Sequence, residues 1–520
     1  MRRLYLAVLL LELVGLFAMA SADHVVDEFA GPPVRPVLTD PLAGAPKGLE
    51  VYYSQKLFWR SCDEWYDDWF DDDHECALLK VPLDYAEPRG DRGRISVLRV
   101  PADPARRMGS LVVNPGGPGH SGMDFADVAG EVFAHPILER FDIVGFDPRG
   151  TGSSSFFDCL SDSAMDEYLA LDPTPDDAAE RAEFAEATEA FGAGCSADDD
   201  APYYAHVTTV EVARDMDVLR AALRHERLDY FGASYGTKLG ATYADLFPER
   251  VGRMVLDGGL GELNDDAAVP SQVKGFQTAL EAYVADCVEG GDCVLGGSRE
   301  AGLARISKFF DGLDAASLNT DDPDRDLTEG HALRAVVSQL YSRAYWSSLT
   351  SAFEDAFAGD GTALLSFADA FTGRWPDGDS WYYDGTWESF VGITCADDPS
   401  SLTVDKIPAR VPAFEKVSPI FGKMAAYGLA TCSGFQGRSL HARHQINATG
   451  IDPILVTGTT RDPATTLKEA EALASKLESA VLIRRDGDGH TAYNSGNECV
   501  DEAIESYLLD GTVPTGTLDC

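Results

Sequence analysis

Short apolar runs recur along the chain, separated by stretches with the periodicity of helices. Several of the runs lack alternation between apolar and polar positions, which is typical of strands covered on both faces. Helical patterns lie between them, most clearly at 209–225 and 237–246. Because strands alternate with helices, we expect a mostly parallel α/β sheet. The predicted strands are 95–100, 111–114, 141–146, 228–231, 253–256, 454–457 and 480–483.

The pattern changes between Asp257 and Ile454. This segment has helical periodicity and few strand-like runs, so we expect an inserted, mainly helical cap. Strand–helix alternation then returns and should complete the sheet. The predicted division is a signal peptide at 1–22, an N-terminal core part at 23–260, a cap at 261–450 and a C-terminal core part at 451–520.

The first residues have the layout of a secretory signal. Arg2 and Arg3 precede an apolar run at 4–17, and small residues follow up to Ala20 and Ala22, where cleavage would fit. An uncleaved anchor is the alternative, although the run is short for a membrane span. We therefore expect export, with no stable membrane insertion after the signal is cleaved.

Cysteine usage supports export independently. The chain has ten cysteines and no Cys-x-x-Cys, so disulfides in an oxidising compartment are favoured over a zinc or thioredoxin-like site. We expect no metal and no cofactor. Sequence alone does not fix the connectivity, and the simplest pairing joins neighbours along the chain: 62–76, 159–195, 287–293, 395–432 and 499–520.

The net charge of −44 excludes nucleic acid and anionic membranes as expected partners. The acidity either keeps the protein hydrated and soluble or attracts cationic substrates. Solubility is the preferred interpretation, because the acidic residues are spread along the whole chain. With 45% hydrophobic residues the chain can also bury a large core, which excludes global disorder.

A Gly-x-Ser-x-Gly pentapeptide surrounds Ser234, between a predicted strand and a predicted helix. In that context it forms the nucleophile elbow of the α/β-hydrolase fold, a turn so tight that small residues must flank the serine. A serine hydroxyl needs an adjacent base, itself oriented by a carboxylate. In this fold the base and the acid follow the serine in the order acid, then histidine.

His490 is the candidate base, because it follows the last predicted core strand directly, in a glycine-rich loop. Two aspartates compete as the acid. Asp462 lies just past the strand at 454–457, and Asp257 ends the strand at 253–256.

Attack on a carbonyl group creates an oxyanion, which needs backbone N–H donors. We expect one donor at Tyr235, directly after the serine, and a second at Gly117 in the loop NPGGPGH at 114–120. A phosphate-binding loop is the rival interpretation, but the Lys-Ser/Thr signature is missing. His120 could line the site, although we expect it to have no role in proton transfer.

These motifs together make the chain resemble the secreted tripeptidyl aminopeptidases of actinobacteria, relatives of the proline iminopeptidases. The resemblance implies that the acid is Asp462, supported by Thr465, and that carboxylates of the cap anchor the substrate ammonium. The acidic stretch at 63–75 and Gly259 depart from the family pattern. The matching motifs are VPLDY at 81–85, NPGGPG at 114–119, FDIVGFDPRGTG at 141–152, GASYG at 232–236, VLDG at 255–258, GTTRDP at 458–463, GDGH at 487–490 and the tail at 507–520.

The leading functional prediction is an exported serine exopeptidase that releases short peptides, in the first place tripeptides, from free N-termini. Its partners are then peptides with a free N-terminus, and its location is extracellular, with cell-wall association as a further option. A secreted carboxylesterase or lipase with the same triad is the alternative. A non-catalytic surface binding protein is the third reading, which the complete set of triad and oxyanion motifs disfavours.

Overall fold

A computed structural model of the chain describes residues 38–66, 69–71, 73–197, 201–262, 270–375, 382, 385–435 and 444–520. The predicted signal peptide lies outside these residues. Within them, no helix is both long enough and apolar enough to cross a membrane.

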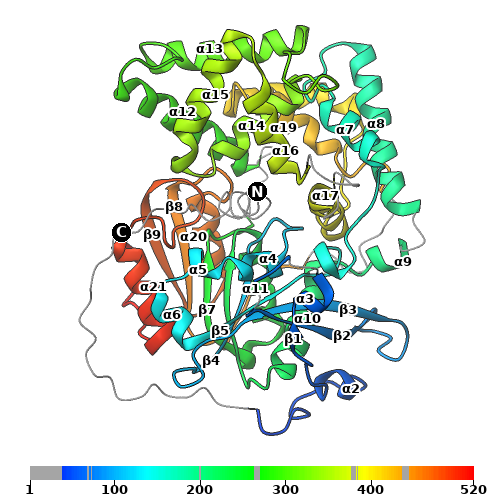
Figure 1. Cartoon of the computed structure of the whole chain (residues 1–520), viewed down its shortest axis with the longest axis vertical. Helices are drawn as coiled ribbons and strands as arrows, with labels where there is room; N and C mark the ends of the chain where they lie inside the picture. The colour runs from blue at the N-terminus through cyan, green and yellow to red at the C-terminus, as the bar shows by residue number, and fades with distance from the viewer. Residues whose placement is uncertain are drawn as a thin grey trace.

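The centre of the described chain is a ten-stranded sheet with the order β1-β2-β3-β5-β4-β6-β7-β8-β9-β10 (Figure 1). Strands β1, β2, β3 and β5 pair antiparallel, and every other pair is parallel, so the predicted mostly parallel sheet is confirmed. The strands are β1 (Arg60–Ser61), β2 (Glu75–Pro82), β3 (Arg92–Val100), β4 (Gly109–Asn114), β5 (Phe141–Phe146), β6 (Leu228–Ala233), β7 (Val251–Asp257), β8 (Ile454–Arg461), β9 (Ala480–Asp488) and β10 (Leu518–Asp519).

Helices cover both faces of the sheet, which explains why its strands show no alternation. In β4, Val112 packs on one face, while Leu111 and Val113 pack on the other, and all three are fully buried. The first face is covered by α10 (Thr209–Ala222), α11 (Tyr235–Leu246) and α20 (Leu467–Lys476), and the second by α4 (Gly122–Asp127), α5 (Ala129–Val132), α6 (His135–Arg140) and α21 (Glu498–Asp510). Three short helices, α2 (Glu50–Tyr53), α3 (Asp63–Tyr66) and α9 (Ala201–Tyr204), lie in connections.

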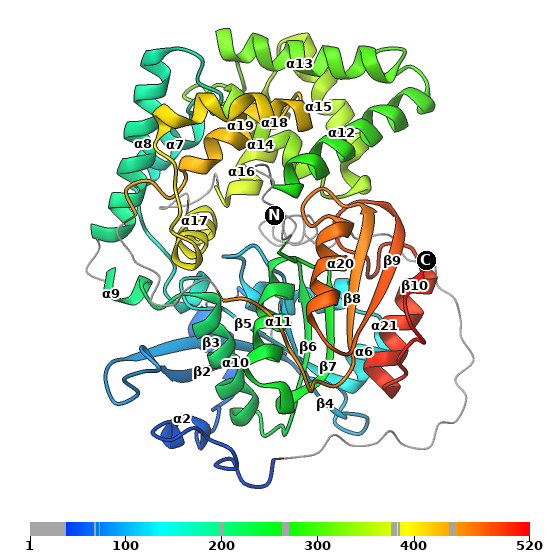
Figure 2. The same ribbon diagram turned by 180° about the vertical axis from the view of Figure 1, so that it is seen from behind.

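A second group of helices forms a roof over the carboxyl ends of the parallel strands (Figures 1 and 2). Most of them lie between β7 and β8, as the change of pattern after Asp257 suggested. Two helices from before β6, α7 (Asp162–Ala170) and α8 (Ala178–Ala197), lie beside them. The others are α12 (Ser271–Gly290), α13 (Arg299–Ala315), α14 (Glu329–Gln339), α15 (Trp346–Ala358), α16 (Thr362–Thr372), α17 (Thr386–Asp397), α18 (Val411–Val417) and α19 (Gly422–Tyr427).

The domain boundaries at residues 260 and 450 remain a proposal. The roof has its own apolar core, built from α12 to α16, which is what an inserted domain requires. Because α7 and α8 also belong to this layer, the 23–260 segment contributes to both layers rather than to the sheet layer alone.

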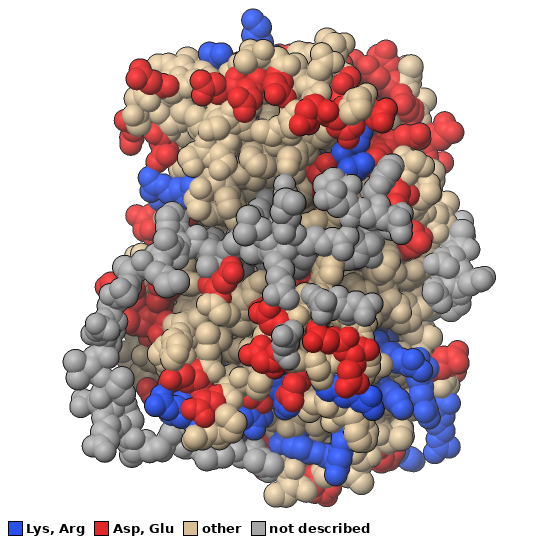
Figure 3. All heavy atoms as spheres, in the orientation of Figure 1, with Lys and Arg blue, Asp and Glu red and all other residues tan. Residues whose placement is uncertain are grey.

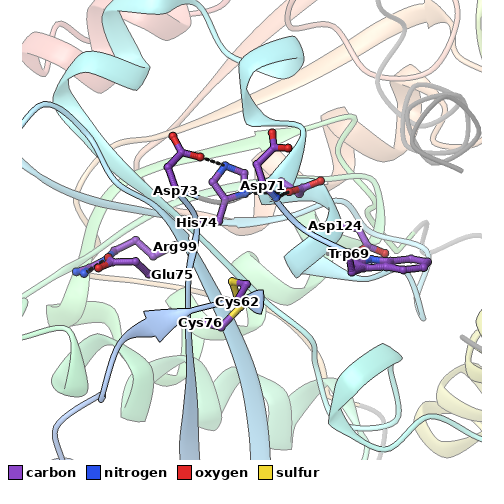
Figure 4. The surroundings of a disulfide bond; sticks show 10 residues. Cys62, Trp69, Asp71, Asp73, His74, Glu75, Cys76, Arg99 and Asp124 are labelled. Carbon is purple, nitrogen blue, oxygen red and sulfur yellow. Dashed lines mark hydrogen bonds and ion pairs between the residues drawn. A yellow bond between two sulfur atoms is a disulfide. The ribbon is translucent and has the colours of Figure 1, made fainter. Parts of the chain in front are cut away.

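Five disulfides join neighbouring cysteines along the chain, so the predicted pairing is confirmed. The first, Cys62–Cys76, ties the segment at α3 to β2 (Figure 4). Beside it, His74 contacts the carboxylate of Asp127 at the end of α4 through Nδ1 (2.9 Å). The last disulfide holds the C-terminal residue against α21. The face of the molecule drawn in Figure 3 carries many acidic side chains over both the sheet and the roof. Most of the basic side chains on this face lie over the sheet.

Candidate active site

Ser234 lies in the turn between β6 and α11, in a backbone conformation that non-glycine residues rarely adopt (φ 57°). The turn is as crowded as the motif predicts. A Cβ atom on Gly232 would lie 2.5 Å from the carbonyl oxygen of Gly236. The N–H of Ser234 donates to the carbonyl oxygen of Asp257 (2.8 Å), which ties the turn to the end of the neighbouring strand. The turn thus presents the serine at the carboxyl edge of the sheet, where ligands of such sheets bind.

His490 and Asp462 form a buried hydrogen-bonded pair. Nδ1 of the imidazole lies 2.9 Å from Oδ1 and 3.0 Å from Oδ2 of the carboxylate. The other ring nitrogen, Nε2, is buried and has no hydrogen-bond partner within the described part of the chain. Such an arrangement leaves Nε2 available to accept a proton from a nucleophile.

The Asp462 carboxylate is fixed by the turn in which it lies. Its Oδ1 accepts the N–H groups of Ala464 and Thr465 (2.9 Å each), and its Oδ2 accepts the N–H of Thr491 (3.1 Å). The hydroxyl of Thr465 lies 3.2 Å from Oδ2 and 3.3 Å from Nδ1 of His490. Thr465 therefore contacts both members of the pair, in agreement with the supporting role that the resemblance implies.

Asp257, the rival acid, does not contact the imidazole through a hydrogen bond. Its carboxylate accepts the N–H groups of Ala492 (2.8 Å) and Tyr493 (3.1 Å) and the hydroxyl of Thr457. Burial raises the pKa of this carboxyl group. Asp257 thus holds the loop that follows His490, while Asp462 holds the ring itself.

Ser234 and His490 converge on the same short segment, Asp257–Gly258. The carbonyl group of Asp257 binds the N–H of Ser234, and a Cβ atom on Gly258 would lie 3.4 Å from Cε1 of His490. The roof also positions the histidine, because the carbonyl oxygen of Tyr341 accepts a hydrogen bond from the backbone N–H of His490 (2.7 Å). The rings of Tyr341 and His490 meet edge to face at 5.3 Å.

The glycine loop after β4 packs directly against the serine turn. A Cβ atom on Gly116 would lie 2.8 Å from Cβ of Ser234 and 2.9 Å from the backbone nitrogen of Tyr235. Tyr235 is the first residue of α11, so its N–H has no acceptor within the helix. Gly117 and Tyr235 line one cavity together with Ser234. The two residues predicted to donate to the oxyanion therefore line the same cavity as the serine.

This cavity has a volume of about 750 Å³ and lies between the strand ends and the roof. Its lining is mostly apolar and aromatic, and includes Tyr341 from the roof. Among the described lining residues only Arg334 and Asp398 are charged at neutral pH. His120 also lines the cavity, and burial lowers the pKa of its imidazole to about 4, so the ring is neutral at pH 7.

Sequence reasoning missed the contributions of the roof, namely Tyr341, Arg334, Trp387 and Asp398. They lie on or beside helices recognisable only by their periodicity, and no motif marks which of their side chains face the sheet. The signal that could have pointed to Arg334 is weak: an arginine among apolar positions of a predicted helix.

Two groups of side chains have the composition of a metal site: Asp71, His74 and Asp127, and Asp172, Asp314 and Glu329. Neither group contributes a residue to the cavity that contains Ser234. Of the predicted site residues, Gly117, Ser234 and Tyr235 line this cavity, whereas His490 lines a second cavity that shares Tyr341 with it.

Comparison with known proteins gives similarities to both peptidases and esterases. The profile of a family described as "TAP-like protein" matches residues 418–520. Serine protease Hip1 of Mycobacterium tuberculosis is 35% identical over 457 residues, which cover 86% of this chain and 87% of Hip1. Carboxylesterase B of the same species is 35% identical over 504 residues, 94% of this chain and 95% of its own. Tripeptidyl aminopeptidase of Streptomyces lividans is 29% identical over 475 residues, 86% and 83% of the two chains.

Proposed function

Because this chain belongs to the TAP-like α/β-hydrolases, the family of serine protease Hip1, we propose that it is a serine exopeptidase that releases short peptides, in the first place tripeptides, from free N-termini. The protein is a serine hydrolase by its family, and the narrower activity is the proposal. The observation that carries it is the one carboxylate, Asp398, among the described residues that line the cavity of Ser234, under a roof of helices.

In the proposed reaction, Ser234 attacks the scissile carbonyl carbon while Nε2 of His490 takes the hydroxyl proton. Asp462 keeps the proton of the neutral imidazole on Nδ1 and stabilises the imidazolium that forms. The N–H groups of Gly117 and Tyr235 bind the oxyanion. His490 then gives its proton to the leaving amine, and a water molecule hydrolyses the acyl-enzyme by the same path in reverse.

Asp398 is the candidate anchor for the substrate ammonium. It is the one carboxylate among the described residues that line the cavity, at the end of α17. An ammonium group buried without a counter-charge would be costly, so a free N-terminus needs such a partner. The roof supplies the wall that prevents a longer chain from passing through.

Export is part of the proposal. The predicted signal and the five disulfides both fit an oxidising compartment outside the cytoplasm.

The test compares a peptide that has a free amine with its N-acetylated twin, at low and at high salt. A lost charge-assisted hydrogen bond costs about 1.5–3 kcal/mol, so the free peptide should be cleaved roughly ten- to a hundredfold faster. High salt screens the negative surface and leaves the local contribution. Asp398→Asn should remove most of this preference, whereas Asp405→Asn, at an exposed roof position, should keep it. Equal cleavage of both peptides at high salt would refute the exopeptidase proposal.

A carboxylesterase is the second candidate, because the cavity lining is mostly apolar and carboxylesterase B is similar over nearly the whole chain. Hydrolysis of neutral p-nitrophenyl esters, with no cleavage of free-amine peptide amides, would favour it.

A further inference from the structure

Arg334 brings a positive charge into the catalytic cavity from the middle of α14. Its Nη1 donates to the carbonyl oxygen of Leu169 in α7 (2.8 Å), and its guanidinium lies 5.4 Å from the ring centre of Trp387 in α17. Three roof helices therefore hold the side chain in place at the wall of the cavity.

No carboxylate of the described residues forms an ion pair with Arg334, in a protein with 86 acidic residues. Two other roof arginines behave in the ordinary way. Arg325 contacts Asp369, and Arg374 contacts Asp166, each at 2.7 Å. Burial lowers the pKa of Arg334, but a guanidinium is so basic that the group stays charged at neutral pH.

The indole beside this guanidinium has a donor of its own to satisfy. The indole N–H of Trp387 is buried and has no acceptor within the described part of the chain. Arg334 is half-buried, and a cation that is partly withdrawn from water without a counter-ion is unfavourable. Since Arg334 faces the space where the substrate is held, the substrate is the available source.

We propose that Arg334 binds a carboxylate of the substrate and gives the enzyme a preference for peptides that carry a negative charge. The proposal rests on the peptidase function proposed above. The carboxylate can belong to an acidic side chain or to the free C-terminus of a short peptide, since both offer two oxygens to a guanidinium. The cavity would then recognise both charges of its substrate, the ammonium at Asp398 and the carboxylate at Arg334.

The length of α17 suggests which peptides to use. Trp387, beside Arg334, and Asp398, directly after the last residue of α17, lie eleven positions apart, or about 17 Å at 1.5 Å per residue. An extended peptide spans at most about 3.3–3.6 Å per residue. An extended pentapeptide therefore has about the length of this stretch of α17, and pentapeptides are used as the probes.

The experiment uses two sets of free-amine pentapeptides. In the first, C-terminally amidated peptides carry Glu or Gln at one position at a time. In the second, an uncharged sequence carries a free C-terminal carboxylate or an amide. The enzymes are wild type, Arg334→Gln, Arg334→Lys and the control Arg305→Gln. Arg305, on α13, is exposed and lies outside the cavity, and its guanidinium lies 4.1 Å from the ring centre of Phe357. Its replacement by Gln therefore removes the same charge and the same kind of ring contact as Arg334→Gln.

We expect wild type to favour the charged member of at least one set about tenfold or more in kcat/KM, mainly through KM. Arg334→Gln should abolish that preference and change the uncharged peptides by less than about threefold, whereas Arg334→Lys keeps part of it and Arg305→Gln all of it. The set that responds identifies the source of the carboxylate. Wild type without a preference in either set, or Arg334→Gln slowing charged and uncharged peptides alike, overturns the proposal.

A second measurement separates failure of this proposal from failure of the peptidase function. Inhibition of p-nitrophenyl acetate hydrolysis by the same peptides reports binding even when none is cleaved. If peptides are not cleaved but the carboxylate strengthens inhibition through Arg334, the peptidase proposal fails and the carboxylate site stands. If inhibition is equally strong with and without the carboxylate, the Arg334 proposal fails.

Discussion

Replacing Asp462 with Asn tests the proposed triad most sharply. The two side chains have the same shape, and Oδ1 of the asparagine can keep the N–H bonds of Ala464 and Thr465. Its amide nitrogen then takes the place of Oδ2, 3.0 Å from Nδ1 of His490 and 3.1 Å from the N–H of Thr491. The N–H groups of His490 Nδ1 and of Thr491 both donate to Oδ2 in the wild type, so the amide nitrogen of the asparagine would face two donors. Moving the imidazole proton to Nε2 relieves the first conflict, but Nε2 can then no longer accept the proton of the nucleophile.

The expected loss is large in turnover and moderate in stability. In other triads the wrong tautomer costs about a thousand- to ten-thousandfold in kcat, which corresponds to roughly 4–5.5 kcal/mol of transition-state stabilisation. The Thr491 N–H left without an acceptor costs on the order of 1–3 kcal/mol of folding free energy. The variant should therefore fold and be nearly inactive.

The assay measures kcat on a neutral ester, normalised to the folded fraction from thermal unfolding, with Asp257→Asn as the matched control. Asp257 accepts the N–H groups of Ala492 and Tyr493 and none from the imidazole, so its variant should lose stability while its loss of kcat stays well below that of Asp462→Asn. A folded Asp462→Asn enzyme with near wild-type turnover, beside an inactive Asp257→Asn enzyme, would move the acid to the earlier strand and refute the reasoning.

Four further outcomes are expected. A fluorophosphonate probe should label Ser234, and Ser234→Ala should abolish both labelling and turnover; labelling at another serine contradicts the assignment. Thiol titration of the denatured, unreduced protein should find essentially no free thiol, since all ten cysteines are paired; two thiols per chain would contradict this. Gly116→Ala should lower kcat at least about tenfold, measured on a neutral ester, because its Cβ would lie 2.6–2.9 Å from the serine turn at φ 105°; an unchanged kcat contradicts the packing. Burial raises the pKa of Glu388 to about 8, so the native state binds more protons than the unfolded state between about pH 4.5 and 8, and stability falls as pH rises through that window. Glu388→Gln should remove this slope, so its Tm relative to wild type should rise from pH 5 to pH 8; a difference independent of pH contradicts the shift.

The sequence predicted the local structure most completely around Ser234. The strand, the turn and the helix around Ser234 are specified by adjacent residues, since a tight turn needs Gly232 and Gly236 wherever the rest of the chain lies. The same local logic predicted seven strands, from β3 to β9, because the part of each strand that is buried on both faces is a short apolar run. The short edge strands β1 and β10 have two residues each and carry no such signal.

The acid and the cavity are different, because they depend on contacts between distant segments. Asp257 and Asp462 both lie at strand ends and are both buried, so position alone could not decide between them, and the resemblance rather than the pattern favoured Asp462. Tertiary structure distinguishes them through the carboxylate that reaches Nδ1 of His490. In the same way the sequence indicated a helical insertion, but only the packing of the roof on the strand ends brings Arg334 and Asp398 into the cavity that the serine lines. Helical periodicity tells which side of a helix is apolar, and it does not tell which element that side will meet.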